Sequence, residues 1–328
     1  MKSSSQPRIA IVHRETRLQG VLQRWATRGQ ARFVMKRAKE AIAGAKAAAQ
    51  TIDLDDLEAE DATYQNAVQQ VARDVGEFGL PVQLVHRQHV PNMDFGLFTV
   101  VLAVGQDGLV ANTAKYVGNT PIIGVNPEPK RFDGVLLPFQ VAQAKAAVQK
   151  VLNGKHHLKP VTLAQVTLHD GQTMLAFNDF FVGVKSHVSA RYCLRVNKKE
   201  EHQSSSGLLV STGAGSTGWM SSVYAMAAGV ASQSGAVWPQ GTPHTPPPLT
   251  WDAPELLWAV REPFKSRQSS ISLIAGKLPQ GQILEVESQM SGNGVIFSDG
   301  IESDFLEFNS GTIARISTAA QRVGLVVP

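Results

Sequence analysis

The sequence predicts an α/β N-terminal domain with a Rossmann-like parallel sheet, followed by a β-rich, sandwich-like C-terminal domain. Apolar strands alternate with helical patterns as far as about residue 152, which is typical of parallel βα units. From Val161 onward, short apolar runs separated by turn residues dominate instead. The change of pattern falls near Gly154, so we expect one domain over residues 1–155 and a second over residues 156–328.

The first domain is expected to consist of repeated βα units. The expected strands are Ile9–Val12, Val82–Val85, Phe98–Val104 and Ile122–Val125. The expected helices are Lys36–Gln50, a helix with Tyr64, Val68, Val71 and Val75 at helical spacing that ends at Gly76, and the segments Gly108–Val117 and Pro138–Leu152. The acidic stretch Asp53–Asp61 is either a loop or the beginning of a helix. Such units form a parallel sheet that binds ligands at the carboxyl ends of its strands.

The second domain is expected to consist mainly of short strands. The expected strands are Val161–Leu168, Phe180–Val184, Tyr192–Val196, Leu208–Ser211, Ile271–Ala275, Ile283–Val286, Val295–Phe297, Ile313–Ile316 and Val323–Val327. One helix is expected from Thr217 to about Gly229. The proline-rich stretch Pro239–Pro254 cannot be regular structure and is expected to be a surface loop.

The composition is that of an ordinary soluble globular protein, with 43% hydrophobic and 18% charged residues. No apolar run is long enough for a membrane-spanning helix or a secretory signal. The net charge is +4, and basic residues are not interleaved with aromatic ones as a nucleic-acid surface would require. The single cysteine fits a reducing compartment. We therefore expect a cytoplasmic protein that binds neither membrane nor nucleic acid.

A glycine-flanked turn, Gly105-Gln106-Asp107-Gly108-Leu109, follows the most apolar strand. Because glycine lacks a Cβ, its backbone N–H groups can approach a phosphate closely. The carboxylate of Asp107 lies inside this turn, where substrate oxygens would arrive. The alternative is a tight turn between a strand and a helix that binds no ligand.

Two segments of the second domain have a similar character. The loop Ser211–Trp219 carries glycines and hydroxyl groups immediately before a helix, where phosphates or ribose hydroxyls can bind. Asn178 and Asp179 offer a donor and several acceptors, which suits a sugar diol. The alternatives are a capped glycine-rich turn for the first segment and an ordinary turn for the second.

Together and in this order, the three segments resemble those of the NAD kinase family, most of all the mitochondrial type, within the wider group that includes diacylglycerol and sphingosine kinases. The family pattern is Gly-Gly-Asp-Gly-Thr, then Asn-Glu, then Gly-Ser-Thr-Ala-Tyr. Further similar segments are Ile122–Pro127, Ser205–Leu208, Val260–Pro263 and Glu307–Gly311. The resemblance extends from about Ile9 to Val327, so it covers nearly the whole chain.

The resemblance implies an ATP-dependent kinase with a nucleotide cleft between two domains. It further implies a homodimer, Mg²⁺, and transfer of the γ-phosphoryl group of ATP to the adenosine 2′-hydroxyl of NAD, which gives NADP. Asp107 matches the catalytic aspartate of the family, the base toward that hydroxyl. The nucleotide-contacting positions are matched by Gly105, Gly108, Asn178, Asp179, Thr217, Gly218, Trp219 and Ser222.

The chain departs from the family pattern at four positions. Gln106 replaces the second glycine and Leu109 replaces the threonine of the turn, which removes a hydroxyl group that could contact phosphate. Asp179 is one methylene shorter than the family's glutamate, and Trp219 replaces tyrosine. Two alternatives therefore stay open: a kinase of the same group that acts on a sugar, nucleoside or lipid hydroxyl, and a nucleotide-binding protein without catalysis.

Other reactive side chains are expected to be structural. Cys193 lies in an expected strand, where we expect it to be a small buried hydrophobic residue. The histidines His86, His89, His156 and His157 are expected at the surface, because their spacing matches no three-ligand metal site. No cluster of carboxylates predicts a protein cage for a metal. Asp299 and Gly300 are expected to form a hairpin turn, in a region that the family uses near its ligand.

Overall fold

The computed structural model describes residues 6–25, 27–42, 54–235 and 244–328. The chain divides into two compact units, of which unit 1 comprises residues 1–158 and 325–328 and unit 2 comprises residues 159–324. The expected division at 155/156 thus differs by three residues from the observed one, and the last four residues lie in unit 1. Each unit is described separately below.

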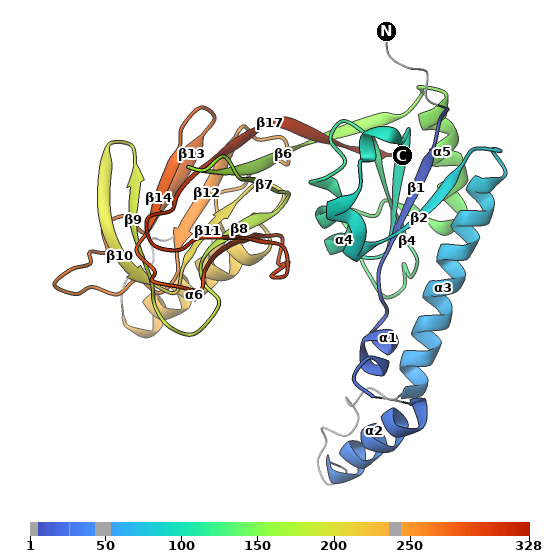
Figure 1. Ribbon diagram of the computed structural model, residues 1–328, viewed down its shortest axis with the longest axis horizontal. Helices are drawn as coiled ribbons and strands as arrows, with labels where there is room; N and C mark the ends of the chain where they lie inside the picture. Colours follow the sequence, from blue (N-terminus) through green and yellow to red (C-terminus); the bar gives the residue numbers. More distant parts are fainter. Residues whose placement is uncertain (1–5, 26, 43–53, 236–243) are drawn as a thin grey trace. The chain divides into compact units, whose positions relative to one another are not determined.

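Unit 1 is built around a parallel sheet (Figure 1). Strands β2 (Val82–His86), β1 (Ile9–His13), β3 (Val100–Val104) and β4 (Ile122–Asn126) lie in this order. Beyond β4 lie the short strand β5 (Phe139–Gln140) and Leu325, near the end of β17 (Ile313–Val327). The central strands are buried on both faces, which explains their continuous apolar sequence.

Helices cover both faces of this sheet. On one face, α3 (Leu54–Gly76) and α5 (Ala144–Leu152) pack their apolar stripes against alternate residues of the central strands. The stripe of α3 includes Tyr64, Val68, Val71 and Val75, as its spacing predicts. The helix α4 (Asp107–Ala114) contacts β1, β3 and β4 and is buried from Leu109 to its end. In the order β2-β1-β3-β4, the strand order reverses between β1 and β3, and a doubly wound sheet binds ligands at this switch point.

A small second cluster lies at the beginning of α3. Helix α1 (Arg17–Leu22) and helix α2 (Arg28–Ile42) pack there, with Leu18, Leu54 and Leu57 buried among them. Two short 3₁₀ helices, η2 (Arg87–Asn92) and η3 (Phe95–Leu97), connect β2 to β3. A third, η4 (Val141–Gln143), precedes α5.

Unit 2 contains two sheets packed face to face. In one sheet, β10 (Lys199–Ser205), β9 (Ala190–Val196), β14 (Leu284–Ser288) and β17 follow one another, and β6 (His157–Leu168) and β7 (Thr173–Ala176) extend it. The other has the order β13 (Ala275–Pro279), β12 (Glu255–Val260), β11 (Leu208–Ser211), β8 (Asp179–Val184), β15 (Gly294–Ser298) and β16 (Phe305–Glu307). The core lies between them and draws alternate residues from both sheets, such as Tyr192 and Phe180.

Helix α6 (Trp219–Gln233) lies on the outer face of the second sheet. Its Met220 is buried against Leu209, Leu257 and Ala259, which point away from the core between the sheets. This face also carries the side chains of Asp179 and Phe181, because residues two apart on a strand share a face. The fold class expected from the sequence is therefore confirmed.

Several element boundaries expected from the sequence are wrong. Helix α2 begins at Arg28, eight residues before the expected start, and the expected segment after residue 42 lies outside the described residues. The acidic stretch forms the first turns of α3, where Asp55 and Asp56 complement the helix dipole. The expected helix at Pro138 begins only at Ala144, after β5 and η4. Residues 271–274 form no strand, because they bind β10 through Glu201 instead.

Candidate functional site

The turn after β3 passes directly into α4. Gln106 caps this helix without a side-chain hydrogen bond, and Asp107 is its first residue. Leu109 is 5% exposed and its N–H donates to the carbonyl oxygen of Gln106 at 2.8 Å. A Cβ at Gly105 would lie 2.9 Å from Cδ2 of Leu109, whereas one at Gly108 would meet open space. The leucine that departs from the family pattern is thus packed over the first glycine.

The carboxylate of Asp107 holds the loop that follows β4. Its Oδ1 accepts from the N–H of Leu136 at 2.8 Å, and its Oδ2 accepts from the N–H of Val135 at 3.2 Å. Each carboxylate oxygen has two lone pairs, so each can accept one further hydrogen bond. The group is therefore fixed in orientation and still able to accept a hydroxyl proton.

Tyr64 joins the carboxyl ends of the two central strands. Its buried hydroxyl group donates to the carbonyl oxygen of Val104 at 2.8 Å and accepts from the N–H of Arg14 at 2.9 Å. Burial raises the pKa of Tyr64, so the group remains a donor at neutral pH. The guanidinium of Arg14 lies 4.9 Å from the centre of its ring. These contacts fix the backbone at the end of β1 and immediately before the glycine turn.

Three arginines surround the buried carboxylate of Glu60, a cluster that the sequence analysis missed. Arg17 hydrogen-bonds it, Arg131 lies 3.1 Å away, and Arg14 lies 4.0 Å away. Burial opposes ionisation of Glu60, but the bonds from Arg17 and Arg131 prevail and lower its pKa. Arg14 is 9% exposed and its Nε has no hydrogen-bond partner. Arg131 also pairs with Glu128 at 3.4 Å, so three cations face two carboxylates, and the remaining positive charge favours phosphate.

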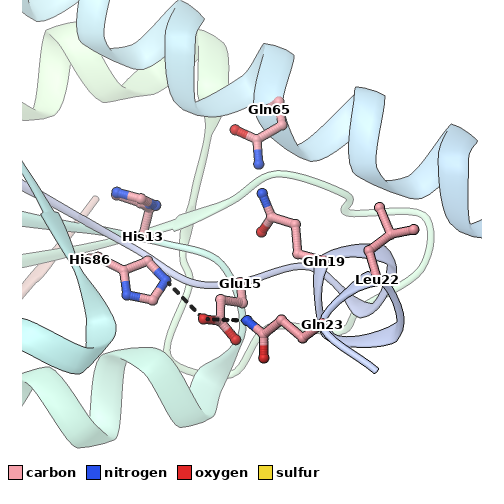
Figure 2. A pocket seen from close by; sticks show the side chains of 7 residues that line it. All are labelled: His13, Glu15, Gln19, Leu22, Gln23, Gln65 and His86. Carbon is pink, nitrogen blue, oxygen red and sulfur yellow. Dashed lines mark hydrogen bonds and ion pairs between the residues drawn. The ribbon is translucent and has the colours of Figure 1, made fainter. Parts of the chain in front are cut away.

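A polar pocket of about 490 Å³ opens at the carboxyl ends of β1 and β2 (Figure 2). Its lining is formed by His13, Glu15, Gln19, Leu22, Gln23, Gln65 and His86. Glu15 accepts from Gln23 at 3.3 Å and lies 3.9 Å from Nε2 of His86. Burial, and secondarily His86, lowers the pKa of His13, so this ring is neutral at pH 7. His86 therefore lines a pocket and is not the surface residue that we expected, because it ends a strand of the sheet.

In unit 2 the Asn-Asp pair and the glycine loop lie together. The carbonyl oxygen of Asn178 accepts from the N–H of Thr212 at 2.9 Å and from its hydroxyl at 3.2 Å. A Cβ at Gly215 would lie 2.1 Å from the same carbonyl oxygen. The absence of a side chain at Gly215 is therefore what lets the loop approach Asn178. The loop then leads to Gly218, which caps α6.

Asp299 supports this pair, a role that the sequence analysis did not assign to it. Its Oδ1 accepts from the N–H of Asn178 at 2.6 Å, and its Oδ2 accepts from the N–H of Phe177 at 3.2 Å. Asp179 is 7% exposed, and burial together with the nearby charge of Asp299 raises its pKa to about 7. Asp299 has a φ of +56°, and an Asp-Gly pair after a buried strand is the signal that marks this turn.

Aromatic rings lie beside the glycine loop on the outer face of the sheet. Trp219 stacks on Phe181 with ring centroids 5.7 Å apart, and Phe181 contacts Phe297 at 5.0 Å. The guanidinium of Arg261 lies 5.1 Å from the centre of the Trp219 ring. These residues, with Glu302, line a pocket of about 480 Å³. The pocket combines aromatic faces with a cation, which suits a planar group that carries negative charge.

The predicted site residues thus fall into two groups. Gly105, Asp107 and Gly108 form the turn in unit 1, and the other six predicted residues lie within unit 2. In unit 2, Thr217, Gly218 and Ser222 are exposed around the start of α6, beside the partly buried Trp219. Within the described ranges, no three His, Cys, Asp or Glu side chains gather at the Gly105 turn to form a metal cage.

Comparison with known proteins finds similarity to NAD kinases in sequence and the NAD kinase fold in structure. No family model matches the chain. The NAD kinase of Clostridium kluyveri is 27% identical over 128 residues, which is 37% of this chain and 44% of that protein. An NAD kinase from Archaeoglobus fulgidus in complex with ATP is similar over 97% of this chain and 92% of its own, with a TM-score of 0.53 and 17% identity. The resemblance to the NAD kinase family is confirmed.

Yeast NADH kinase in complex with NADH has the same fold. It covers 99% of this chain and 84% of its own, with a TM-score of 0.55 and 13% identity. The NAD kinase fold therefore spans both units. By contrast, the chain matches less than half the length of the curated NAD kinases. In the part of the chain that the structure describes, no helix is long and apolar enough to span a membrane.

Proposed function

We propose that this protein is an ATP-dependent NAD kinase that transfers the γ-phosphoryl group to the adenosine 2′-hydroxyl of NAD and yields NADP. One observation carries the proposal. On a chain with the NAD kinase fold, a carboxylate is fixed at the carboxyl end of a central strand with lone pairs left for a hydroxyl group.

Asp107 is the group that accepts the hydroxyl proton. The 2′-oxygen attacks the γ-phosphorus, the bond from phosphorus to the bridging oxygen of ADP breaks, and the proton passes to Asp107. The N–H groups of Val135 and Leu136 keep the carboxylate oriented during this step. Positioning of this kind is the main contribution that a protein makes to phosphoryl transfer.

The remaining groups of unit 1 bind the phosphoryl donor. Gly105 and Gly108 let the phosphates approach the beginning of α4, whose dipole favours negative charge. Arg14 supplies a cation next to this turn, because its Cδ would lie 3.9 Å from a Cβ at Gly105. The polar pocket beside it (Figure 2) accepts the base and ribose of ATP through the amides of Gln19, Gln23 and Gln65.

The groups of unit 2 bind NAD. Asn178 and Asp179 hold the ribose hydroxyls, and Thr217, Gly218 and Ser222 present donors at the start of α6. Trp219 offers its ring for stacking. Because Asp299 fixes the backbone N–H groups of Phe177 and Asn178, it acts as a positioning residue for the pair.

Mg²⁺ accompanies the nucleotide in this proposal. Among the described residues, Asp107 belongs to no group of three His, Cys, Asp or Glu side chains that could form a protein cage for the ion. Such an ion would be held mainly by the phosphates, which is common for nucleotide-bound Mg²⁺. The proposal also includes a homodimer in the cytoplasm, with a role in NADP biosynthesis.

The test is direct. Purified protein is incubated with Mg²⁺-ATP and NAD, and NADP is measured with an NADP-specific dehydrogenase. We expect NADP to form at a rate proportional to protein, with ADP released in equal amount. Polyphosphate in place of ATP identifies the phosphoryl donor. If no NADP forms but ADP is released with another hydroxyl compound, that compound and not NAD is the acceptor. Tight binding of the nucleotides without turnover would contradict catalysis.

A further inference from the structure

Cys193 lies on an unexpected face of its strand. As predicted from the sequence it is fully buried, but it does not belong to the core between the sheets of unit 2. Its neighbours Tyr192 and Leu194 point into that core, so Cys193 points outward. On this outer face charged side chains cover the thiol, among them Arg195, which binds Glu200 at 2.7 Å and Glu287 at 2.8 Å.

Two further metal-ligating side chains lie on the same face. In the β9–β10 hairpin (Figure 1), His202 is directly opposite Cys193, and Glu200 lies two residues before His202. The thiol, a carboxylate oxygen of Glu200 and a ring nitrogen of His202 all lie within 4.8 Å of one another. Both Glu200 and His202 are exposed, so a cation can reach them from solvent.

The backbone around the three side chains is rigid. The hairpin turn consists of Asn197 and Lys198, both with positive φ, which fixes the register of the two strands. On its inner face, β10 is held by Glu201, which accepts from the N–H groups of Ser272 and Leu273. The N–H of Ser270 donates to the carbonyl oxygen of His202. The ligating side chains therefore project from a preorganised sheet.

We propose that Cys193, Glu200 and His202 bind one Zn²⁺ ion per chain, with water as the fourth ligand. Sulfur, nitrogen and oxygen donors together select a borderline-soft divalent cation, and three protein ligands leave one open position. In a tetrahedral site with ordinary metal–ligand bond lengths, the ligand atoms lie about 3.5 Å apart. Rotation of the three side chains is therefore enough to bring their ligand atoms to this spacing. This proposal is independent of the kinase activity.

The neighbouring groups suit a bound cation. The amide nitrogen of Gln289 lies 2.8 Å from Nδ1 of His202, and this hydrogen bond fixes the orientation of the imidazole ring. Arg195 and Glu200 form one hydrogen bond through Oε2, and a carboxylate has a second oxygen for the metal.

Cobalt substitution tests this site. Cys193 is the only cysteine of the chain, so any thiolate-to-cobalt band must come from this residue. The full-length protein is stripped of metal and titrated with Co²⁺. We expect one thiolate-to-cobalt charge-transfer band at one ion per chain, and Zn²⁺ should abolish it. Cys193→Ser should lose the band. Glu200→Gln and His202→Asn should weaken Co²⁺ binding about ten-fold or more.

Matched controls come from the same unit. Glu255→Gln removes a carboxylate that pairs with Lys277, and His187→Asn removes an exposed imidazole outside the hairpin; both should keep the full band. Glu200 and His202 are exposed, so their variants test the site even if Cys193→Ser does not fold. Absence of the band in the unmodified protein, or equal Co²⁺ affinity in the Glu200 and His202 variants, would overturn the proposal.

Discussion

At the scale of single residues, the proposed site contains two aspartates in different environments. Asp107 is partly exposed and has both oxygens bound by backbone N–H groups, so its orientation is fixed while lone pairs remain. Asp179 is almost fully buried beside Asp299, so its charge is unfavourable until a ligand or a proton offsets it. The sequence predicted both as site residues, but their different environments follow only from the structure.

The first prediction concerns the carboxylate that we propose as the catalytic base. Asp107→Asn keeps one oxygen acceptor and the approximate shape, but its amide cannot take a proton. We expect turnover to fall about a hundred-fold or more, with ligand binding close to that of the unmodified protein. Steady-state formation of NADP, with NAD and ATP affinities measured by calorimetry, checks this. Unchanged turnover would exclude Asp107 as the base.

The second prediction concerns the pH dependence of stability. The pKa of Asp179 is raised to about 7 in the folded protein and is about 4 when unfolded, so the folded state binds more protons between these values. Its contribution to the free energy of unfolding is therefore fully present below about pH 4 and is lost as the pH rises through 7.

The loss amounts to a few kcal/mol, at most about 4. Asp179→Asn cannot ionise, so its urea-unfolding midpoint should fall less than that of the unmodified protein between about pH 4 and 7, the range between the unfolded and the folded pKa of Asp179. Glu255→Gln, which changes a pair outside this site, serves as the control. Parallel pH profiles of the unmodified protein and Asp179→Asn would contradict the assignment.

At the scale of elements, glycines determine how closely the loops approach the strands. Gly215 faces a backbone carbonyl oxygen, Gly105 faces the end of a flexible leucine side chain, and Gly108 faces open space. Only the first is a strict steric requirement, because backbone cannot rotate away as a side chain can. Sequence alone treats all three alike.

A third prediction follows from this ranking. Gly215→Ala places a Cβ 2.1 Å from the carbonyl oxygen of Asn178, so the loop must move and stability should fall by about 1–3 kcal/mol or more. Gly108→Ala, within the first turn of α4, should instead be neutral or stabilise by up to about 1 kcal/mol. Urea unfolding of both variants measures the difference. Equal effects would contradict the predicted loop geometry.

The fourth prediction concerns the turn that departs from the family pattern. Restoring the family residues with Gln106→Gly and Leu109→Thr adds a hydroxyl group near the phosphates, but it also removes a leucine that is 5% exposed. We expect the loss of packing to cost about 2–4 kcal/mol of stability. Thermal unfolding, with turnover at several ATP concentrations, separates the two effects. Full stability would show that Leu109 does not support the turn.

At the scale of the whole molecule, the NAD kinase fold extends over nearly all of the chain. Unit 1 carries the turn and the arginine cluster, and unit 2 carries the Asn-Asp pair and the glycine loop. Each group is held by hydrogen bonds within its own unit. We therefore expect that ligand binding to the residues of either unit can be measured as an increase in the stability of the folded protein.

The fifth prediction uses this linkage. A ligand that binds only the folded state at about 100 times its dissociation constant stabilises that state by about 2.7 kcal/mol. NAD and ATP should each raise the midpoint of thermal unfolding by several degrees, and Asp179→Asn should reduce the shift with NAD but not with ATP. If neither nucleotide shifts the midpoint, the protein does not bind them as proposed.

The sequence by itself determined the fold class and the order of the three site segments. Hydrophobic periodicity reports which residues are buried, and glycine, asparagine and aspartate mark where the chain must turn. The tertiary structure alone revealed the arginines around Glu60, the support of Asn178 by Asp299, and the outward position of Cys193. These contacts join residues far apart in the chain, and their partners are set by strand order and register, which no local pattern records.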